Sequence, residues 1–364
     1  MAQAYLDQTE TILAGERDYR KVMGRTGPLV YPAGHVWLFV FFDYLSDHGA
    51  RRLLMQVVFL VIQVATVGLL ARTVGEADAR ALKWCLLWAT TQRARNVFVN
   101  GLFNDAPQVL LVYAALYLLL VRRQPGAALL TYSLAVSVKM SALLYAPAFL
   151  LVYWHQFGLR RTVAYGLAAG AVQVALALPF LATHPRAYLE RSFELGRQFH
   201  HFLSHNWKFL PEPLFHDRRL HVGLLVAHVA LVLFYYYRRG WLRRRDPARP
   251  WAAADQLDAF VVTNLVGVVC ARSLHYSFYL WYFHTLPWIY YRLGLGPVVA
   301  GTFAVGMEVV WNQWQSYKSY DLLHSGPVRE VTVGFAVLHI ALVALVLWRA
   351  RPTAGPPPPA DKSE

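Results

Sequence analysis

Long apolar runs alternate with short polar stretches along almost the whole chain after residue 28. Twelve runs predict membrane-spanning helices or parts of them: residues 32–45, 53–71, 82–92, 104–121, 126–138, 141–154, 162–182, 220–237, 256–271, 278–291, 297–311 and 328–348. Several approach the ~20 residues that a helix needs to cross a bilayer, whereas others hold fewer than ~17. We expect short neighbours to merge or to enter the membrane without crossing it, which gives about ten spans or partial spans. The pattern predicts an all-α, polytopic membrane helix bundle.

Gly166 and Gly170 lie four positions apart within the run 162–182. Two small residues at this spacing let helices approach closely in a membrane. We expect this face to make a contact within the bundle rather than between two copies of the chain.

The composition supports a membrane protein. Hydrophobic residues make up 57% of the 364 residues and charged residues 15%, and the mean hydropathy is +0.32. Globular proteins average roughly 45–50% apolar and about 25% charged residues, so a soluble chain of this size has no interior large enough for the excess. Both cysteines, Cys85 and Cys270, lie in apolar runs. This placement excludes a disulfide framework and a cysteine-based zinc site.

The net charge of +14 predicts an orientation in the membrane. Its densest cluster, six arginines between residues 238 and 249, directly follows the apolar run 220–237. Positive residues concentrate in cytosolic loops, which places residues 183–219, 272–277 and 312–327 together on the opposite side. The proline-rich residues 351–364 predict a disordered cytosolic tail. A nucleic-acid patch explains the charge less well, because no recognised nucleic-acid-binding module accompanies it.

Four polar islands interrupt the apolar pattern. In the first, residues 15–34, repeated Gly and Pro predict a structured loop rather than a helix. Its acidic residue Asp18 is a candidate general base for a sugar hydroxyl, and the alternative is a solvated loop with local ion pairs.

In the second island, residues 93–107, Asp105 is a candidate for orienting a sugar or for pairing with Arg93 or Arg95. The plainer alternative is that Asn104 and Asp105 cap the following helix.

Lys139 interrupts the apolar stretch near the second island. A lysine in this position suits a phosphate as a point charge, and the alternative is a side chain that extends to the membrane interface.

The third island, residues 188–212, combines aromatic rings with cations. Arg197, Asn206 and Lys208 suit an anionic ligand that carries a sugar, because rings offer faces to sugars and cations bind phosphate oxygens. His201 and His205 have a spacing that places two histidines on one helix face, but the zinc signal is weak without an HExxH arrangement.

The fourth island, residues 271–287, contains Arg272, His275 and Tyr276 beside five further aromatic residues. An aromatic interface belt explains the rings, but not an arginine and a histidine together on the side opposite the basic cluster. Guanidinium and imidazole groups there suit a lipid-linked phosphate. No nucleotide fingerprint, Walker sequence or Ser-His-Asp pattern is present, so neither a nucleotide-driven pump nor a hydrolase has support from a motif.

Six motifs in order resemble one family: GRTGPLVYPAGH (24–35), LFNDAP (102–107), SLAVSVKMSALLYAPA (133–148), RSFELGRQF (191–199), NWKFLPE (206–212) and RSLHYSFYLWYFHTLPW (272–288). They are similar to the dolichyl-phosphate-mannose-dependent α-1,3-mannosyltransferases of asparagine-linked glycosylation, with similarity from about Tyr5 to Lys318. The resemblance implies a GT-C glycosyltransferase in one membrane-embedded domain, residues 1–350. It also implies the endoplasmic reticulum membrane and transfer on its lumenal face.

The same resemblance implies the substrates and the reaction. Mannose passes from dolichyl-phosphate mannose to Man5GlcNAc2-PP-dolichol, in a single inverting displacement with no covalent intermediate. A carboxylate activates the acceptor hydroxyl while cations stabilise the departing lipid phosphate. Arg272 and His275 are the expected phosphate ligands, with Lys139 and Lys208 as further candidates. Membrane lipid is the expected surrounding, and neither a metal nor another cofactor nor nucleic acid is expected.

One departure from the family concerns the base. Family members carry a transmembrane helix and an Ile-Asp-Trp-like segment ahead of an Ala-Tyr pair, and that aspartate is the expected general base. Here the pair is Ala4-Tyr5, and only the three residues from Met1 to Gln3 precede it. We therefore expect that the family's aspartate lies upstream of Met1, that the first helix is missing and that the loop carrying Asp18 is loosely held. The alternatives are an inactive truncated homologue, or a transporter or flippase of lipid-linked sugars.

Overall fold

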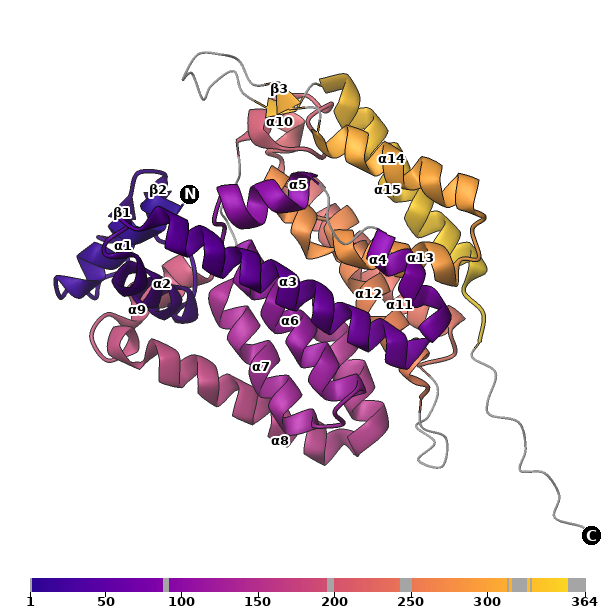
Figure 1. Ribbon diagram of the computed structural model, residues 1–364, viewed down its shortest axis with the longest axis horizontal. Coiled ribbons are helices and arrows are strands. Elements are labelled where there is room, and N and C mark those ends of the chain that lie inside the picture. The colour runs from indigo at the N-terminus through magenta and orange to yellow at the C-terminus, as the bar shows by residue number, and fades with distance from the viewer. Residues whose placement is uncertain are drawn as a thin grey trace, which may run out of the picture.

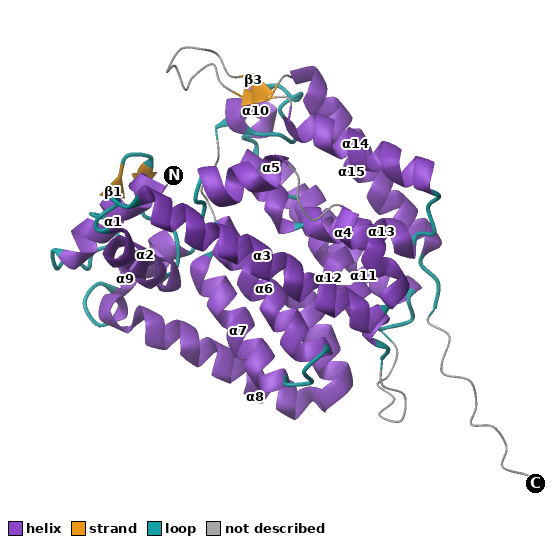
Figure 2. Ribbon diagram, viewed as in Figure 1, coloured by secondary structure: helices purple, strands orange, loops and turns teal. Residues whose placement is uncertain are grey.

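The protein is helical throughout almost all of its described length (Figure 2). The computed structural model describes residues 2–87, 92–194, 200–242, 251–312, 314–315, 326–327 and 329–352. Two short antiparallel hairpins, β1–β2 and β3–β4, are the strands within these ranges. The all-α membrane-type architecture predicted from the sequence is confirmed.

The amino-terminal half contains one short hairpin and the two longest of the described helices, α3 (Arg52–Ala77) and α8 (Ala146–Leu181). Its elements are α1 (Ala2–Leu13), β1 (Met23–Gly24), β2 (Gly27–Pro28), α2 (Ala33–Ser46), α3 (Arg52–Ala77), η1 (Ala79–Ala81), α4 (Leu82–Leu87), α5 (Gln92–Arg95), the π-helical turn η2 (Asn96–Asn100), α6 (Asp105–Leu120), α7 (Pro125–Val138), η3 (Met140–Tyr145) and α8 (Ala146–Leu181).

The carboxy-terminal half contains shorter elements between longer helices. They are α9 (Pro185–Ser192), η4 (His201–Leu203), α10 (Glu212–Phe215), α11 (Arg218–Arg238), α12 (Ala253–Val269), η5 (Tyr276–Trp281), η6 (Phe283–Thr285), α13 (Leu286–Arg292), α14 (Pro297–Asn312), β3 (Trp314–Gln315), β4 (Gly326–Pro327) and α15 (Arg329–Arg349).

Most predicted runs coincide with helices; two predictions are corrected, and one merger of short neighbouring runs agrees with expectation. The run 278–291 is not one helix but the 3₁₀ turns η5 and η6 followed by α13. The runs 141–154 and 162–182 belong largely to α8, which is broken at Gly158 (φ 77°, ψ 170°). Glycine adopts this positive φ without the clash that a Cβ would cause, so two arms meet there without a loop. The polar amino terminus contains the helix α1, which the pattern did not predict.

Four segments in the described part of the chain are long and apolar enough to cross a membrane: Arg52–Ala77, Met140–Leu181, Arg218–Arg238 and Glu330–Arg349. The shorter helices α6 and α7 are also apolar. The total of about ten spans or partial spans stays a prediction, as does the domain boundary at residue 350. Met1 and the residues beyond Pro352, including most of the predicted tail, lie outside the described ranges.

The amino-terminal segment packs on the far arm of α8 and on α9, at the left of Figure 1. Tyr19 is fully buried, and its ring centroid lies 4.9 Å from those of both Phe180 and Tyr188. The Trp37 indole donates a hydrogen bond to the Leu176 carbonyl (2.8 Å). These contacts fix the loop around Asp18, so the expectation of a loosely held loop is wrong.

The loops predicted on the side opposite the basic cluster do meet at one end of the bundle. The backbone N–H of His205 donates to the carbonyl of Leu274 (2.8 Å). Strand β4 contacts η4, which brings residues 326–327 to the same end. The described residues of these three loops therefore lie together, and the side of the membrane on which they lie stays a prediction.

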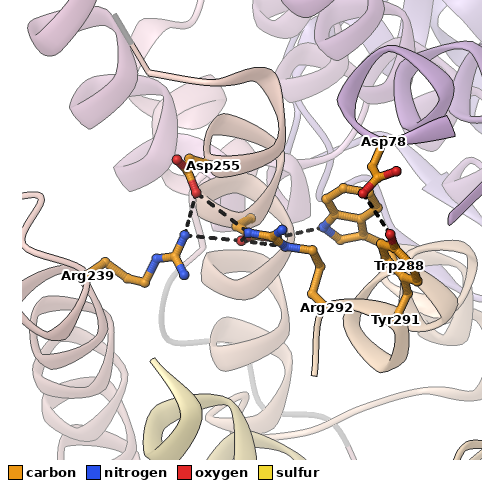
Figure 3. A network of polar contacts seen from close by, with 7 residues as sticks. Asp78, Arg239, Asp255, Trp288, Tyr291 and Arg292 are labelled. Carbon is orange, nitrogen blue, oxygen red and sulfur yellow. Dashed lines mark hydrogen bonds and ion pairs between the residues drawn. The ribbon is translucent and has the colours of Figure 1, made fainter. Parts of the chain in front are cut away.

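A network of ion pairs around the buried Asp258 joins helices at the opposite end (Figure 3). Arg239 after α11 reaches Asp255 (2.6 Å) and Asp258 (3.3 Å) on α12. Arg292 of α13 pairs with Asp258 (2.7 Å), which also accepts a bond from the Trp288 indole (2.9 Å). Arg239 is thus an internal link between helices rather than a solvated member of the basic cluster, most of which lies outside the described residues.

Candidate functional site

The centre of the candidate site is an ion pair between Lys139 and Asp105. The Lys139 ammonium lies 2.7 Å from Oδ1 of Asp105, and the same oxygen accepts a hydrogen bond from the Trp281 indole (2.6 Å). Asp105 is fully buried and Lys139 is 8% exposed. Three of the six motifs, on α6, after α7 and on η5, therefore converge on one carboxylate.

Asn104 extends this network toward the amino terminus. Its side-chain oxygen accepts bonds from Lys139 (3.2 Å) and from the Tyr5 hydroxyl (3.3 Å). Its amide donates to Nδ1 of His35 (3.2 Å). A neutral His35 then carries its proton on Nε2, and this buried atom has no hydrogen-bond partner within the described ranges. The first motif thus joins the site through α2.

Aromatic rings surround the ammonium group. The Lys139 Nζ lies 4.9 Å from the ring centroid of Phe278, 5.7 Å from that of Trp281 and 5.8 Å from that of Tyr31. Phe278 stacks on Trp281 with centroids 3.9 Å apart. A cation over ring faces is attracted by their quadrupoles, so these rings add to the attraction of the carboxylate.

Helix ends bring the polar groups together. Asp105 opens α6 and Asn104 precedes it, while Lys139 follows α7 in an extended conformation. Asn104 makes no side-chain cap to α6, so the helix-capping alternative is wrong for this residue. Lys139 points inward rather than to the interface, and Asp105 pairs with Lys139 rather than with Arg95. These contacts decide three of the alternatives left open by the sequence.

A second group of predicted residues lies in the loop junction beside this network. The side chains of Asn206 and Trp207 both donate to the carbonyl of Ala271. The hydroxyl of Ser204 donates to Asn206 Oδ1 (2.9 Å), and Asn206 is 3% exposed. Asn206 therefore fastens the third island to the fourth, immediately before Arg272.

His275 connects the junction to the buried network. Its Nδ1 caps η5 by accepting from the N–H of Ser277 (3.5 Å), and its ring centroid lies 4.2 Å from that of Tyr276. Phe103 contacts both rings, with centroids at 6.2 and 5.3 Å. The His275 ring is also 5.9 Å from Phe278, which lies over Lys139.

The two further cations of the junction are half-buried. Burial lowers the pKa values of Arg272 and of Lys208, because desolvation disfavours their charged forms. The Lys208 ammonium donates to the carbonyl of Phe202 (3.0 Å). Partly desolvated cations attract an anion more strongly than cations in water, so this junction suits a phosphate.

Asp18 lies in a different part of the amino-terminal segment. Its carboxylate accepts from the backbone N–H of Arg20 (3.0 Å), and Arg20 pairs with Glu190 of α9 (2.6 Å). Its described contacts belong to this turn and not to the Lys139 network.

Two residues of the sequence-based hypotheses fall outside the described ranges. Arg197 lies in the gap between residues 194 and 200, and Met1 precedes Ala2, where the description begins. The aspartate expected upstream of Met1 therefore stays a prediction, as does the role of Arg197.

Tyr5, His35 and Trp281 belong to the site but were not predicted as site residues. His35 and Trp281 lie within motifs of the resemblance and Tyr5 belongs to the Ala-Tyr pair, and His35 is a polar ring in the apolar run 32–45. An ionisable residue within an apolar run is itself a signal of function. Within the described ranges no group of three or more metal-ligating side chains occurs.

Comparisons with known proteins give one consistent result. The family model described as "ALG3 protein" matches residues 2–319. The human Dol-P-Man:Man(5)GlcNAc(2)-PP-Dol alpha-1,3-mannosyltransferase is 35% identical over 95% of this chain and 80% of the human protein. The proteins of the same name from Arabidopsis thaliana (87% of this chain, 77% of that protein) and Neurospora crassa (86% and 76%) are also 35% identical. No solved structure matches.

The match covers every motif that converges on Lys139 and on the loop junction, and the relatives agree on one family. The chain belongs to the ALG3 protein family.

Proposed function

We propose that this protein transfers mannose from dolichyl-phosphate mannose to Man5GlcNAc2-PP-dolichol in α-1,3 linkage, at the lumenal face of the endoplasmic reticulum membrane. The observation that carries the proposal is the family membership, since the curated relatives are named for this reaction. The meeting of polar loops at one end of a membrane bundle supports it. No observation favours a transporter or flippase.

The reaction is a single displacement at the anomeric carbon. The β-linked sugar of the donor and the α-linked product require inversion, and the lipid phosphate leaves without a general acid. Arg272, His275 and Lys208 are the proposed phosphate ligands, because the desolvated cations of Arg272 and Lys208 stabilise the charge that develops on the leaving group and the His275 ring lies in the same loop as Arg272. Tyr276 offers a ring face for the sugar, and Asn206 holds the loop. A further proposed ligand is Arg197.

A carboxylate has to accept the proton of the acceptor hydroxyl. Asp18 is the candidate within this chain, and the family's aspartate ahead of the Ala-Tyr pair is the other. The engagement of Asp18 with its own turn favours the family's aspartate as the base. A base acts from about 3 Å, so the one that acts has to approach the junction around Arg272.

The experiment is expression of an extended chain, joined ahead of Met1 to its relatives' upstream helix and Asp-Trp segment, in cells that lack this mannosyltransferase and accumulate Man5GlcNAc2-PP-dolichol. Lipid-linked oligosaccharides are extracted and their masses are measured by mass spectrometry. Digestion with α-mannosidases of known linkage specificity then identifies the linkage of the added sugar. Addition of one α-1,3-linked hexose supports the proposal. An unchanged precursor, from a chain that is present and inserted in the membrane, contradicts it. The same assay in microsomes with added dolichyl-phosphate mannose distinguishes a failure to use the donor from a shortage of donor in the cells.

A further inference from the structure

The Lys139 ammonium has three protons, and the protein offers a partner for each. Two point to Asp105 Oδ1 (2.7 Å) and to Asn104 Oδ1 (3.2 Å), and the Phe278 ring lies 4.9 Å away. The charge is therefore neutralised within the protein. A phosphate that approached Lys139 would have to compete with a buried carboxylate at contact distance.

Asp105 depends on Lys139 just as strongly. It is fully buried, and its second oxygen, Oδ2, has no hydrogen-bond partner within the described ranges. A buried carboxylate without a counter-ion is costly, because removal of one partner leaves an uncompensated charge in a low dielectric. The two residues therefore form one unit.

This unit contacts two other segments of the chain. Asp105 holds η5 through the Trp281 indole, Lys139 lies over Phe278 of the same turn, and Asn104 beside Asp105 binds Tyr5 of α1. Residues of η5 directly follow Arg272 and His275, and the His275 ring contacts Phe278. A displacement of η5 therefore displaces the loop that carries the proposed phosphate ligands.

We infer that Lys139 and Asp105 are positioning residues that fix η5, and with it the Arg272–His275 loop, rather than ligands of the donor phosphate or of a sugar. The inference rests on the proposed function for its activity readout. It also changes the roles expected for both residues from the sequence, where each was a candidate for direct contact with substrate.

The test is a double-mutant cycle in the chain extended with its relatives' upstream helix and Asp-Trp segment: Lys139→Met, Asp105→Asn and the combination. Each single change breaks the pair, whereas the combination leaves two uncharged side chains. For the singles we expect a lower unfolding midpoint and a loss of kcat/KM on the order of 10- to 100-fold, mostly through KM for dolichyl-phosphate mannose. In the double variant we expect most of the lost stability and most of the lost kcat/KM to be restored.

A control pairs Lys208→Met with Asp105→Asn. Lys208 donates to the Phe202 carbonyl, and the described contacts of Asp105 do not include Lys208. The losses of stability and of kcat/KM caused by these two changes should therefore add, and the combination should recover neither.

Cys270, partly exposed beside the loop, gives a readout that needs no activity. In a Cys85→Ala background, Lys139→Met speeds maleimide labelling of Cys270 several-fold, and the combination returns the rate toward that of the unaltered pair.

The outcomes separate the two proposals. Recovery of stability and labelling without recovery of transfer would mean that Lys139 contacts substrate, which overturns the positioning role. Additive losses in all readouts would overturn the unit itself. If the extended chain with the unaltered pair transfers no mannose, the proposed function fails, and the labelling rates and unfolding midpoints still decide whether the pair fixes the loop.

Discussion

Gly34 of α2 lies against Ser137 of α7 so closely that a methyl group on Gly34 would stand 2.0 Å from the Ser137 hydroxyl oxygen and 2.9 Å from its backbone carbonyl carbon. This approach lets His35 and Lys139, which lie close to the two residues in sequence, join the same network. Gly34→Ala therefore forces α2 and α7 apart. Overpacking typically costs about 1–3 kcal/mol, so we expect a lower unfolding midpoint in detergent and weaker transfer.

Gly166→Ala is the matched control, because nothing lies within 4 Å of the added methyl group. Gly166 and Gly170 line a cavity of about 270 Å³ between α7 and α8. The small-residue face does lie against α7 within the bundle, since the Ser133 hydroxyl donates to the Ala169 carbonyl (2.7 Å) between the two glycines, as expected from the sequence. An unchanged midpoint in Gly34→Ala would contradict the close approach.

Arg272→Ala should abolish most donor use while leaving membrane insertion intact, because the change removes a half-buried cation from the proposed phosphate site. The measurement is transfer from dolichyl-phosphate mannose in microsomes. Arg219→Ala, an exposed arginine at the start of α11, serves as the control for a general loss of charge. Transfer by Arg272→Ala at the rate of the unaltered protein would exclude Arg272 from the site.

The two candidate bases can be separated genetically. We expect that the chain joined ahead of Met1 to its relatives' upstream helix and Asp-Trp segment rescues cells lacking the enzyme, and that Asp→Asn in that segment abolishes rescue. Asp18→Asn in the same protein should retain it, because Asp18 is held in its own turn with Arg20. Rescue by the chain without the extension, lost on Asp18→Asn, would instead identify Asp18 as the base.

The orientation in the membrane is tested with glycosylation acceptor tags. A tag near His216, at the end of the molecule where the loops meet, should be modified in the lumen. A tag between residues 245 and 249 should stay unmodified, because the basic cluster is predicted to remain in the cytosol. Modification of the second tag alone would reverse the orientation and move the proposed site to the cytosol.

The contacts of Asp78, at the end of the molecule opposite the site, predict that the stability of the protein depends on pH. Hydrogen bonds from Arg80 (2.9 Å) and, as Figure 3 shows, from the Tyr291 hydroxyl (2.7 Å) hold the pKa of Asp78 well below its usual range. A carboxyl group with a lowered pKa contributes stability above its unfolded value of about 3.9 and loses it as the pH falls. Asp78→Asn should lower the unfolding midpoint at pH 7, and the difference should shrink below pH ~4. A constant difference across this range would contradict the assignment.

The sequence predicted most helices but not the pairing of charges between them. Hydrophobic period and length identify α3, α11 and α15, because each follows from local composition. The Lys139–Asp105 pair joins residues 34 positions apart, and neither residue's neighbours reveal its partner. The same holds for Arg239 and Asp258. From the sequence, Arg239 is one solvated arginine of the basic cluster, and nothing near Asp258 indicates that the two residues form an ion pair.

The candidate site was predicted in part. Arg272, His275, Asn206 and Lys208 do lie in one junction, since the orientation argument placed their loops on the same side. Asp18 does not join them in the described contacts, because Tyr19 anchors its turn to α9. His35 and Trp281 escaped prediction because a histidine in an apolar run and a tryptophan in an aromatic cluster both have ordinary explanations as packing.

The break in α8 at Gly158 lets one helix pack on two different parts of the molecule. The arm before Gly158 packs on α12, where the ring centroids of Phe149 and Phe260 lie 4.6 Å apart, and the arm after it holds Trp37 and Tyr19 at its far end. The direction that the backbone takes at this one residue therefore decides where the amino-terminal segment packs. An unbroken α8 would carry Leu176 and Phe180 away from Trp37 and Tyr19, and the turn that holds Asp18 would lose the surface on which it rests.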